Sequence, residues 1–326
     1  MFRSSLLCGA ASAALLLPLS PALGQPHGEV ETVISTASPL GSVTATISDR
    51  VDAGTVLRGG GANLADALRS IPGISGAGMA VGANRPLIRG MDASRVRLLE
   101  NGTSSSDASD IGPDHGVPID PLSARSIEVV RGAAALRYGS QAIGGVINVI
   151  NNRVPTSLPT APSLEAAAAY DSVSDGREIL LLGDASAGSL AFHADGFWRS
   201  ADSYDTPLGL QPNSFFRGKG LSVGSSAFFG ESRLGAAYVH FDSRYGIPGE
   251  PAFIDMRQDK GMLHSSLDMG DGLLQVINIS GSYSDYSHDE KDLATDAVNS
   301  TFINQEFDGR AEALLIATWA QRRAAQ

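Results

Sequence analysis

The chain has 326 residues, of which 18% are charged, and its formal net charge is -11. The acidic balance argues against a nucleic-acid partner, and the low charged fraction is unusual for an ordinary soluble domain. The length suits two domains of about 100–200 residues each.

Residues 1–24 have the composition of a secretory signal peptide. Arg3 gives the segment a positively charged N-terminal region, and the apolar core at 6–17 that follows is too short to span a bilayer. Small residues at 22–24 offer a cleavage site. A buried N-terminal helix is the alternative. Cys8, the only cysteine, lies in this segment, so the mature chain has no disulfide although it is exported. This combination suits a Gram-negative envelope protein.

Residues 25–47 are polar and rich in Gly, Ser, Thr and Pro, so we expect a flexible arm that does not pack. Within the arm, residues 31–37 form the short strand-prone run E-T-V-I-S-T-A. Such a run can add a strand to the edge of a partner's sheet, or it can be a plain linker.

Residues 48–152 mix helix and strand signals and predict an α+β domain. Asn63 is the expected N-cap of a helix over 63–70, and the Pro-Gly pair at 72–73 ends that helix. The elements predicted after it are strands at 86–90 and 96–100, a tight turn at 101–102, and a glycine-rich strand–helix–strand unit at 126–151. That last unit has few polar side chains and is expected to pack rather than to bind.

From residue 163 the pattern changes to segments of about ten residues in which apolar and small or polar residues alternate. Residues 190–200 and 234–242 show this clearly. Short turns such as 269–272 alternate with longer loops such as 245–255, as in outer-membrane barrels, and no later segment is apolar enough for a transmembrane helix. We expect about eight strands of an antiparallel transmembrane β-barrel, with a soluble β-sandwich as the alternative.

The loop at 103–121 is polar and carries the run D-A-S-D-I-G-P-D-H at 107–115. Carboxylates and an imidazole on an irregular loop suit zinc or a similar ion, with further ligands supplied by the strands. His264 and His288, the latter followed by two acidic residues, are candidates to contribute. An Asp-His pair by itself is more often structural.

Enzyme motifs are missing from the sequence. There is no P-loop, nucleophile motif or spaced acid pair, and Gly73, Gly76 and Gly78 neither follow a clear strand nor open a helix. The sequence therefore predicts a non-enzyme that requires no cofactor. A surface adhesin or ligand-binding barrel without transport is one functional class that fits.

Taken in order, these segments resemble TonB-dependent outer-membrane receptors over residues 25–315. Residues 31–37 resemble the TonB box, 64–73 the first plug helix, and 127–148 the closing half of the plug. The TonB-box residues are Glu31, Thr32, Val33, Ile34 and Ser35. The plug-motif residues are Arg89, Gly90, Glu128, Arg131, Gly132, Gly139, Gly144 and Gly145.

The resemblance implies an α+β plug inside a 22-stranded barrel that contacts the lipid of the Gram-negative outer membrane. Ligand would bind from outside, and the TonB box would then reach the energy-transducing TonB protein in the periplasm. Arg89, Glu128 and Arg131 would form ion pairs between plug and barrel, because a charge inside the lumen needs a partner.

The acidic loop run, together with Y-G-I-P-G at 245–249, resembles the zinc-uptake branch of this family. That likeness implies that Asp114 and His115 bind zinc as the transported ligand, with His288 as a further candidate. Members of the branch often carry a His-rich loop next, whereas residues 250–258 contain no histidine. A siderophore or cobalamin-type receptor is the alternative for this small metal ligand.

A barrel of 22 strands at about 9–11 residues each needs far more chain than follows residue 152, so the sequence predicts a truncated or frame-shifted product. The expected divisions are a signal peptide at 1–24, an arm with the TonB box at 25–47, a plug at 48–152, a linker at 153–162, a partial barrel at 163–315 and a non-strand tail at 316–326.

Overall fold

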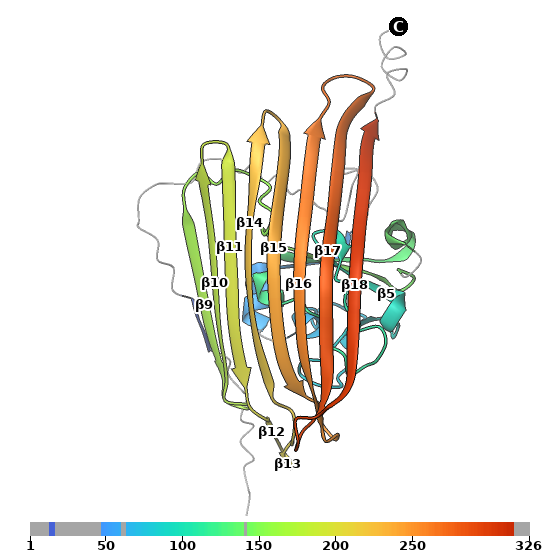
Figure 1. Ribbon diagram of the computed structural model, residues 1–326, viewed down its shortest axis with the longest axis vertical. Coiled ribbons are helices and arrows are strands. Elements are labelled where there is room, and N and C mark those ends of the chain that lie inside the picture. The colour runs from blue at the N-terminus through green and yellow to red at the C-terminus, as the bar shows by residue number, and fades with distance from the viewer. Residues whose placement is uncertain (1–12, 17–46, 60–62, 140–141, 316–326) are drawn as a thin grey trace, which may run out of the picture.

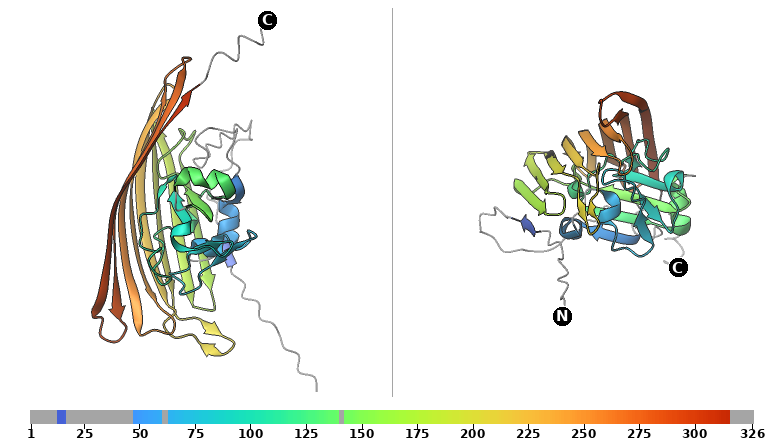
Figure 2. Two further views of the ribbon diagram at one scale, coloured as in Figure 1. Left: turned by 90° about the vertical axis from the view of Figure 1, so that its right-hand side faces the viewer. Right: turned by 90° about the horizontal axis from the view of Figure 1, so that it is seen from below.

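The computed structural model describes residues 13–16, 47–59, 63–139 and 142–315. It shows a large curved antiparallel sheet with a small α/β domain against its concave face (Figures 1 and 2). The predicted TonB box and tail lie outside the described residues, as does most of the predicted signal peptide. These three assignments therefore stay predictions.

The large sheet has nine strands in the order β1-β9-β10-β11-β14-β15-β16-β17-β18. Neighbouring strands are antiparallel, and the strands from β9 onward confirm the predicted barrel segment. A separate hairpin is formed by β12 and β13. The bounds are β1 Ala13–Leu16, β9 Ser163–Asp171, β10 Gly176–Ala187, β11 Leu190–Ala201, β12 Asp205–Thr206, β13 Gly209–Leu210, β14 Phe216–Phe229, β15 Ser232–Gly246, β16 Ala252–Asp268, β17 Leu274–Asp292 and β18 Val298–Leu315.

Burial alternates along the strands with the predicted period of two. In β15, Val239, Phe241 and Tyr245 are buried, whereas Leu234 and Tyr238 are exposed on the opposite face. Large apolar side chains are exposed along neighbouring strands too: Ile179, Leu181, Phe192, Trp198, Leu221, Val223, Leu263, Tyr283 and Phe307. One face of the sheet is therefore an apolar outer wall, the arrangement found in membrane barrels.

The small domain, called the plug below, contains a five-stranded sheet in the order β2-β7-β8-β5-β6. β5 and β8 are parallel, and the other pairs are antiparallel. Among the described residues, no helix is long and apolar enough to cross a membrane. The plug elements are β2 Ile47–Asp52, α1 Ala53–Gly59, α2 Leu64–Ala67, β3 Ile74–Gly76, β4 Pro86–Ile88, η1 Ala93–Arg95, β5 Val96–Glu100, β6 Thr103–Ser104, η2 Pro121–Ser123, β7 Ser126–Val130, η3 Gly132–Tyr138 and β8 Gly145–Ile150.

The helix predicted at 63–70 is α2, which is shorter than expected. Asn63 is its N-cap, because the Asn63 side chain accepts a hydrogen bond from Asp66 N at 3.0 Å. Leu68 follows as the C-cap, and Ile71 N then donates to Leu68 O at 2.9 Å in a turn. The cap prediction is confirmed, while the chain leaves the helix earlier than the sequence pattern indicates.

The strand–helix–strand unit is confirmed by β7, η3 and β8, with a 3-10 helix in the middle. Gly145 has φ +144, and a Cβ there would lie 2.8 Å from Val130 O, so glycine lets β8 begin directly against β7. Asn148 interrupts the apolar run of β8, and its side chain accepts a hydrogen bond from Gly102 N at 2.9 Å. It thereby holds the turn between β5 and β6.

A single apolar core joins the plug to the sheet. Leu68, Ile88 and Ile127 of the plug cluster with Phe241 of β15 and Met256 of β16. Burial of these side chains removes apolar surface of both parts from water and stabilises the docked arrangement. The loop between β6 and η2 is held at this interface.

Candidate metal site between plug and sheet

The loop at 105–120 carries the predicted Asp114-His115 pair. One of its turns is closed by a hydrogen bond from His115 N to Gly112 O at 3.3 Å. A Cβ on Gly112 would lie 2.6 Å from Asp114 Oδ1, so glycine lets the loop close tightly around this carboxylate. The loop therefore presents the carboxylate and the imidazole next to each other.

His115 is buried, and its hydrogen bonds define its proton arrangement. Nδ1 lies 3.0 Å from Ala108 O, and a carbonyl only accepts, so Nδ1 carries a hydrogen. In the neutral ring, Nε2 then carries a lone pair and no hydrogen. That Nε2 lies 3.4 Å from Glu290 Oε1 and 3.8 Å from Asp114 Oδ1. A lone pair facing carboxylate oxygens is stabilised by a proton or by a cation placed among them.

His288 of β17 lies against His115, with ring centroids 4.4 Å apart. Phe302 of β18 stacks on His288 at 4.7 Å and excludes water from that side. The His288 Nδ1 atom is 2.8 Å from the Tyr286 hydroxyl. Its Nε2 atom is buried and has no hydrogen-bond partner among the described residues. A buried polar atom without a partner is costly in a structural core and is expected where a ligand binds.

The ligand atoms of His115, His288 and Glu290 lie within 4.8 Å of one another, and Asp114 is the fourth candidate ligand. A metal ion at about 2.0–2.2 Å from two ligand atoms holds them at most about 4.4 Å apart, so small movements of these side chains toward one centre would let them bind a single ion. The structure thus brings together Asp114, His115 and His288, the three predicted metal residues. Glu290 joins them because it lies two positions from His288 on the same face of β17.

His264, considered as a further ligand, lies elsewhere on the sheet. It pairs with Ser280 of β17, whereas Met256 pairs with His288. At ~3.3 Å per residue, His264 is therefore roughly 26 Å along the strands from the site.

Tyr245, the first residue of the Y-G-I-P-G motif, fastens the loop to β15. Its hydroxyl accepts a hydrogen bond from Gly116 N at 2.7 Å and donates one to Asp114 O at 2.9 Å. The side chain is fully buried. These two bonds hold the backbone on both sides of His115.

A second set of charged contacts joins plug and sheet, and the sequence pattern did not reveal it. Arg153, just after β8, lies between two carboxylates. Its Nη1 is 2.5 Å from Glu100 Oε1 of the plug, and its Nε and Nη2 donate to Asp195 of β11 at 3.1 and 3.2 Å. All three residues are buried.

Further groups extend this set on both sides. Lys260 of β16 lies 3.4 Å from Glu100 Oε2 and donates to Ser104 O at 2.7 Å. His193 lies between Asp195 and Asp184, at 3.1 and 2.9 Å. We call the whole set the Arg153 network; its members are Glu100, Arg153, Asp184, His193, Asp195 and Lys260.

The residues predicted to pair with the barrel wall behave differently. Arg131 forms an ion pair with Asp49 of β2 at 3.1 Å, inside the plug. The predicted pairing of Arg131 with the barrel stays a prediction. Arg89 is exposed, and Glu128 is buried in β7, an inner strand of the plug sheet. Family motifs located plug residues, but they did not reveal which charges cross the interface.

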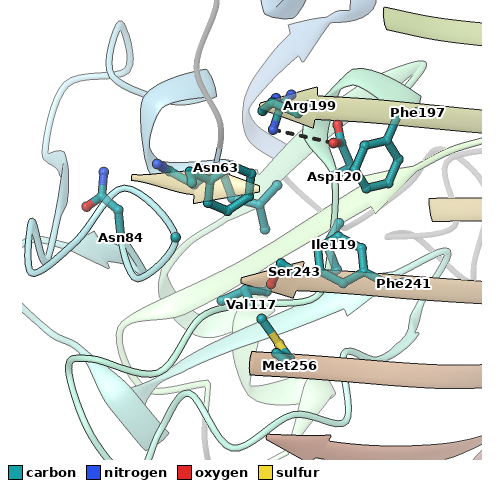
Figure 3. A pocket seen from close by; sticks show the side chains of 13 residues that line it. Asn63, Asn84, Val117, Ile119, Asp120, Phe197, Arg199, Phe241, Ser243 and Met256 are labelled. Atoms are coloured by element: carbon teal, nitrogen blue, oxygen red, sulfur yellow. Dashed lines mark ion pairs between the residues drawn. The ribbon is translucent and has the colours of Figure 1, made fainter. Parts of the chain in front are cut away.

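A third contact is the ion pair of Arg199 with Asp120, at 3.4 Å (Figure 3). Phe197, Phe241 and Met256 line the space around it. The cavity there is about 10 Å³, room for about one water molecule. This region is therefore packing between plug and sheet.

Comparisons with known proteins agree with this fold. Residues 39–146 match the family described as TonB-dependent Receptor Plug Domain. The chain is 32% identical over 167 residues to the Ferric enterobactin receptor PirA of Pseudomonas aeruginosa, covering 45% of this chain and 22% of that protein. It is 33% identical over 170 residues to the Vitamin B12 transporter BtuB of Vibrio vulnificus, covering 49% and 27%. The solved Copper transporter OprC superposes with a TM-score of 0.71 at 16% identity, over 82% of this chain and 43% of that chain.

The domain at 39–146 is therefore a plug of the TonB-dependent receptor type, and the large sheet matches the barrels of such receptors. The chain spans about a quarter of the length of the two curated relatives, with 22% and 27% of them covered. The names of these relatives do not confirm the zinc branch.

Proposed function

We propose that this chain belongs to an outer-membrane receptor that takes up a metal ion or small metal chelate, with zinc as the favoured cargo. The observation that carries the proposal is the buried, unpartnered Nε2 of His288 next to His115 and Glu290. Two imidazole nitrogens and two carboxylates form a donor set that suits tetrahedral zinc. Hard cations such as Mg²⁺ prefer oxygen donors alone.

A larger metal chelate is the second candidate, and a cavity favours it. A space of about 480 Å³ lies between the plug loop and β18 and shares Phe302 with the surroundings of the site. Arg97, Ser105 and Asn304 are among its polar lining residues. The volume is in the range of small-molecule sites, and the relatives named for enterobactin and vitamin B12 point the same way.

Energy for uptake would come through the TonB box at Glu31–Ser35, which would pair with the TonB protein in the periplasm. The plug match and the receptor-type relatives support this role, as does the apolar outer wall of the sheet for an outer-membrane location. The chain acts as a receptor for transport in this proposal, without catalysing a reaction.

Zinc calorimetry on the detergent-solubilised chain tests the proposal. The double variant Asp114→Ala with His115→Ala should lose zinc binding, because half of the donor set is removed. His264→Ala is the matched control, since that imidazole lies outside the site. Unchanged zinc binding in the double variant would overturn the site assignment, and a ferric chelate bound by the unaltered chain without zinc binding would favour the second candidate.

A further inference from the structure

We infer that Tyr245 is a positioning residue that fastens the plug half of the metal site to its barrel half, so that metal binding and plug docking stabilise each other. The inference rests on the proposed metal site and concerns how that site is assembled and released. Tyr245 itself would not touch the metal.

The site is divided between two parts of the molecule. Asp114 and His115 come from the plug loop, whereas His288 and Glu290 come from β17. A metal bound by both pairs ties the plug to the barrel wall. Because a ligand that binds only the docked arrangement stabilises that arrangement, docking and metal binding must strengthen each other.

Tyr245 is the residue best placed to control the plug half. Its hydroxyl bonds to Gly116 N and Asp114 O, the backbone groups on either side of His115. Its ring also lies directly on plug backbone, because a Cβ on Gly82 would come within 2.3 Å of the ring. Glycine at this position therefore lets the plug contact the flat aromatic side chain.

Tyr286 plays the matching part on the barrel half. It is fully buried, and its hydroxyl contacts His288 Nδ1 at 2.8 Å. When Nδ1–H donates to the tyrosine oxygen, His288 Nε2 carries the lone pair that can bind a metal. Each half of the site thus has one buried tyrosine that orients one histidine.

The divided site has a consequence for release. A metal ion needs its ligand atoms within a few tenths of an ångström of ideal distances. Displacement of the plug loop would break the two hydrogen bonds of Tyr245 and move His115 away from His288. The metal would then lose half of its ligands, so motion of the plug is sufficient to release it.

Tyr245→Phe tests this arrangement, because it removes the hydroxyl and keeps the ring. We expect zinc affinity to fall about 10–100-fold, the usual effect of losing an orienting partner. Hydrogen exchange should also show that zinc protects the amides of 105–120 in the unaltered chain and protects them less in the variant. Tyr238→Phe is the control, since Tyr238 lies on the same strand but faces outward.

A double-mutant cycle separates positioning from general stability. In a His115→Ala background, Tyr245→Phe should have little further effect on zinc affinity, because its target is already absent. An equal loss in both backgrounds would overturn the positioning role, as would unchanged affinity in the single variant. If Tyr245→Phe unfolds, Tyr286→Phe provides the same cycle with His288→Ala. Failure of the unaltered chain to bind zinc would instead contradict the proposed function.

Discussion

Two of the polar zones in which the plug meets the sheet are built in opposite ways. In the Arg153 network, buried carboxylates face buried cations, and Asp195 accepts hydrogen bonds from both Arg153 and Ser222. At the candidate metal site, His288 Nε2 has no hydrogen-bond partner among the described residues, and His115 Nε2 faces the Glu290 carboxylate. The first zone is complete without a ligand, whereas the second becomes complete when a cation enters.

The protonation state of Glu100 shows why the Arg153 network needs no added ligand. Burial raises the pKa of Glu100, but the nearby charges of Arg153 and Lys260 outweigh burial and hold the pKa below its ordinary value. The carboxylate therefore stays charged at neutral pH, and it binds Arg153 at 2.5 Å and Asn151 at 2.7 Å. We infer that the network holds the plug whether or not a cation occupies the candidate metal site.

The largest effect should follow from Arg153→Met. This change leaves Glu100 and Asp195 buried with fewer cations, which destabilises a protein by about 3–5 kcal/mol. Denaturant unfolding and limited proteolysis of the plug would measure the loss. Arg177→Met is the control, because Arg177 and its partner Asp175 are exposed.

The same variant also tests whether the two zones depend on each other. Because the metal site needs the docked plug, Arg153→Met should weaken zinc binding although Arg153 lies outside that site. Normal zinc affinity in an otherwise destabilised variant would show that the plug loop docks independently of the network.

The second prediction concerns His288→Ala, which removes a barrel-side ligand. Zinc affinity should fall about 100-fold or more, because a first ligand contributes at least as much as an orienting group. The unfolding free energy in the absence of metal should change less than in Arg153→Met, since the variant loses the hydrogen bond between His288 Nδ1 and the Tyr286 hydroxyl but leaves no buried charge without a partner. A fall in zinc affinity no larger than that of His264→Ala would remove His288 from the site.

The sequence indicated the candidate metal site but did not indicate the Arg153 network. Asp114, His115 and His288 were predicted as metal ligands because metal-ligand residue types are few and an irregular loop carried two of them, and the structure places the three residues near one another. The Arg153 network was missed, since Glu100 and Asp195 are ordinary strand residues by pattern and lie far apart in the chain. Their pairing depends on which strand the plug faces, and a period of two gives only the face and not the neighbour.

The fold was easier to predict because it depends on local signals. Alternation indicated the strands, and Asn63 indicated the helix start. The length of α2 was overestimated, because the helix was expected to continue toward the Pro-Gly pair at 72–73, whereas the chain leaves the helix at its C-cap Leu68. The role of Tyr245 could have been suspected from its motif, but its bonds to the plug loop appear only in three dimensions.

The third prediction uses pH to separate the loss of zinc from the loss of plug docking. Acidification should release zinc first, because protons compete for the histidine and carboxylate ligands. Glu100 has a lowered pKa, so its contribution to stability is fully present above the unfolded-state pKa of about 4.3 and is lost as pH falls through the folded-state value.

In the pH range in which zinc has been released and Glu100 is still ionised, we therefore expect a docked plug without bound zinc. Zinc calorimetry and proteolysis of the plug, carried out over the same pH series, would reveal the two transitions. Coincident loss of zinc and of plug protection near pH 6 would contradict the separation of the zones.

The smallest effect should come from Arg125→Ala at the rim of the network. Arg125 lies 3.3 Å from Asp184 Oδ2, but its side chain is 60% exposed, so water and salt screen the pair. Asp184 also keeps His193 and Asn152 as partners. We expect a change in unfolding free energy of about 0.5 kcal/mol or less, smaller still at high salt, with unaltered zinc affinity. A loss as large as that of Arg153→Met would mean that plug retention depends on the exposed rim, and burial would then no longer explain why the network holds the plug.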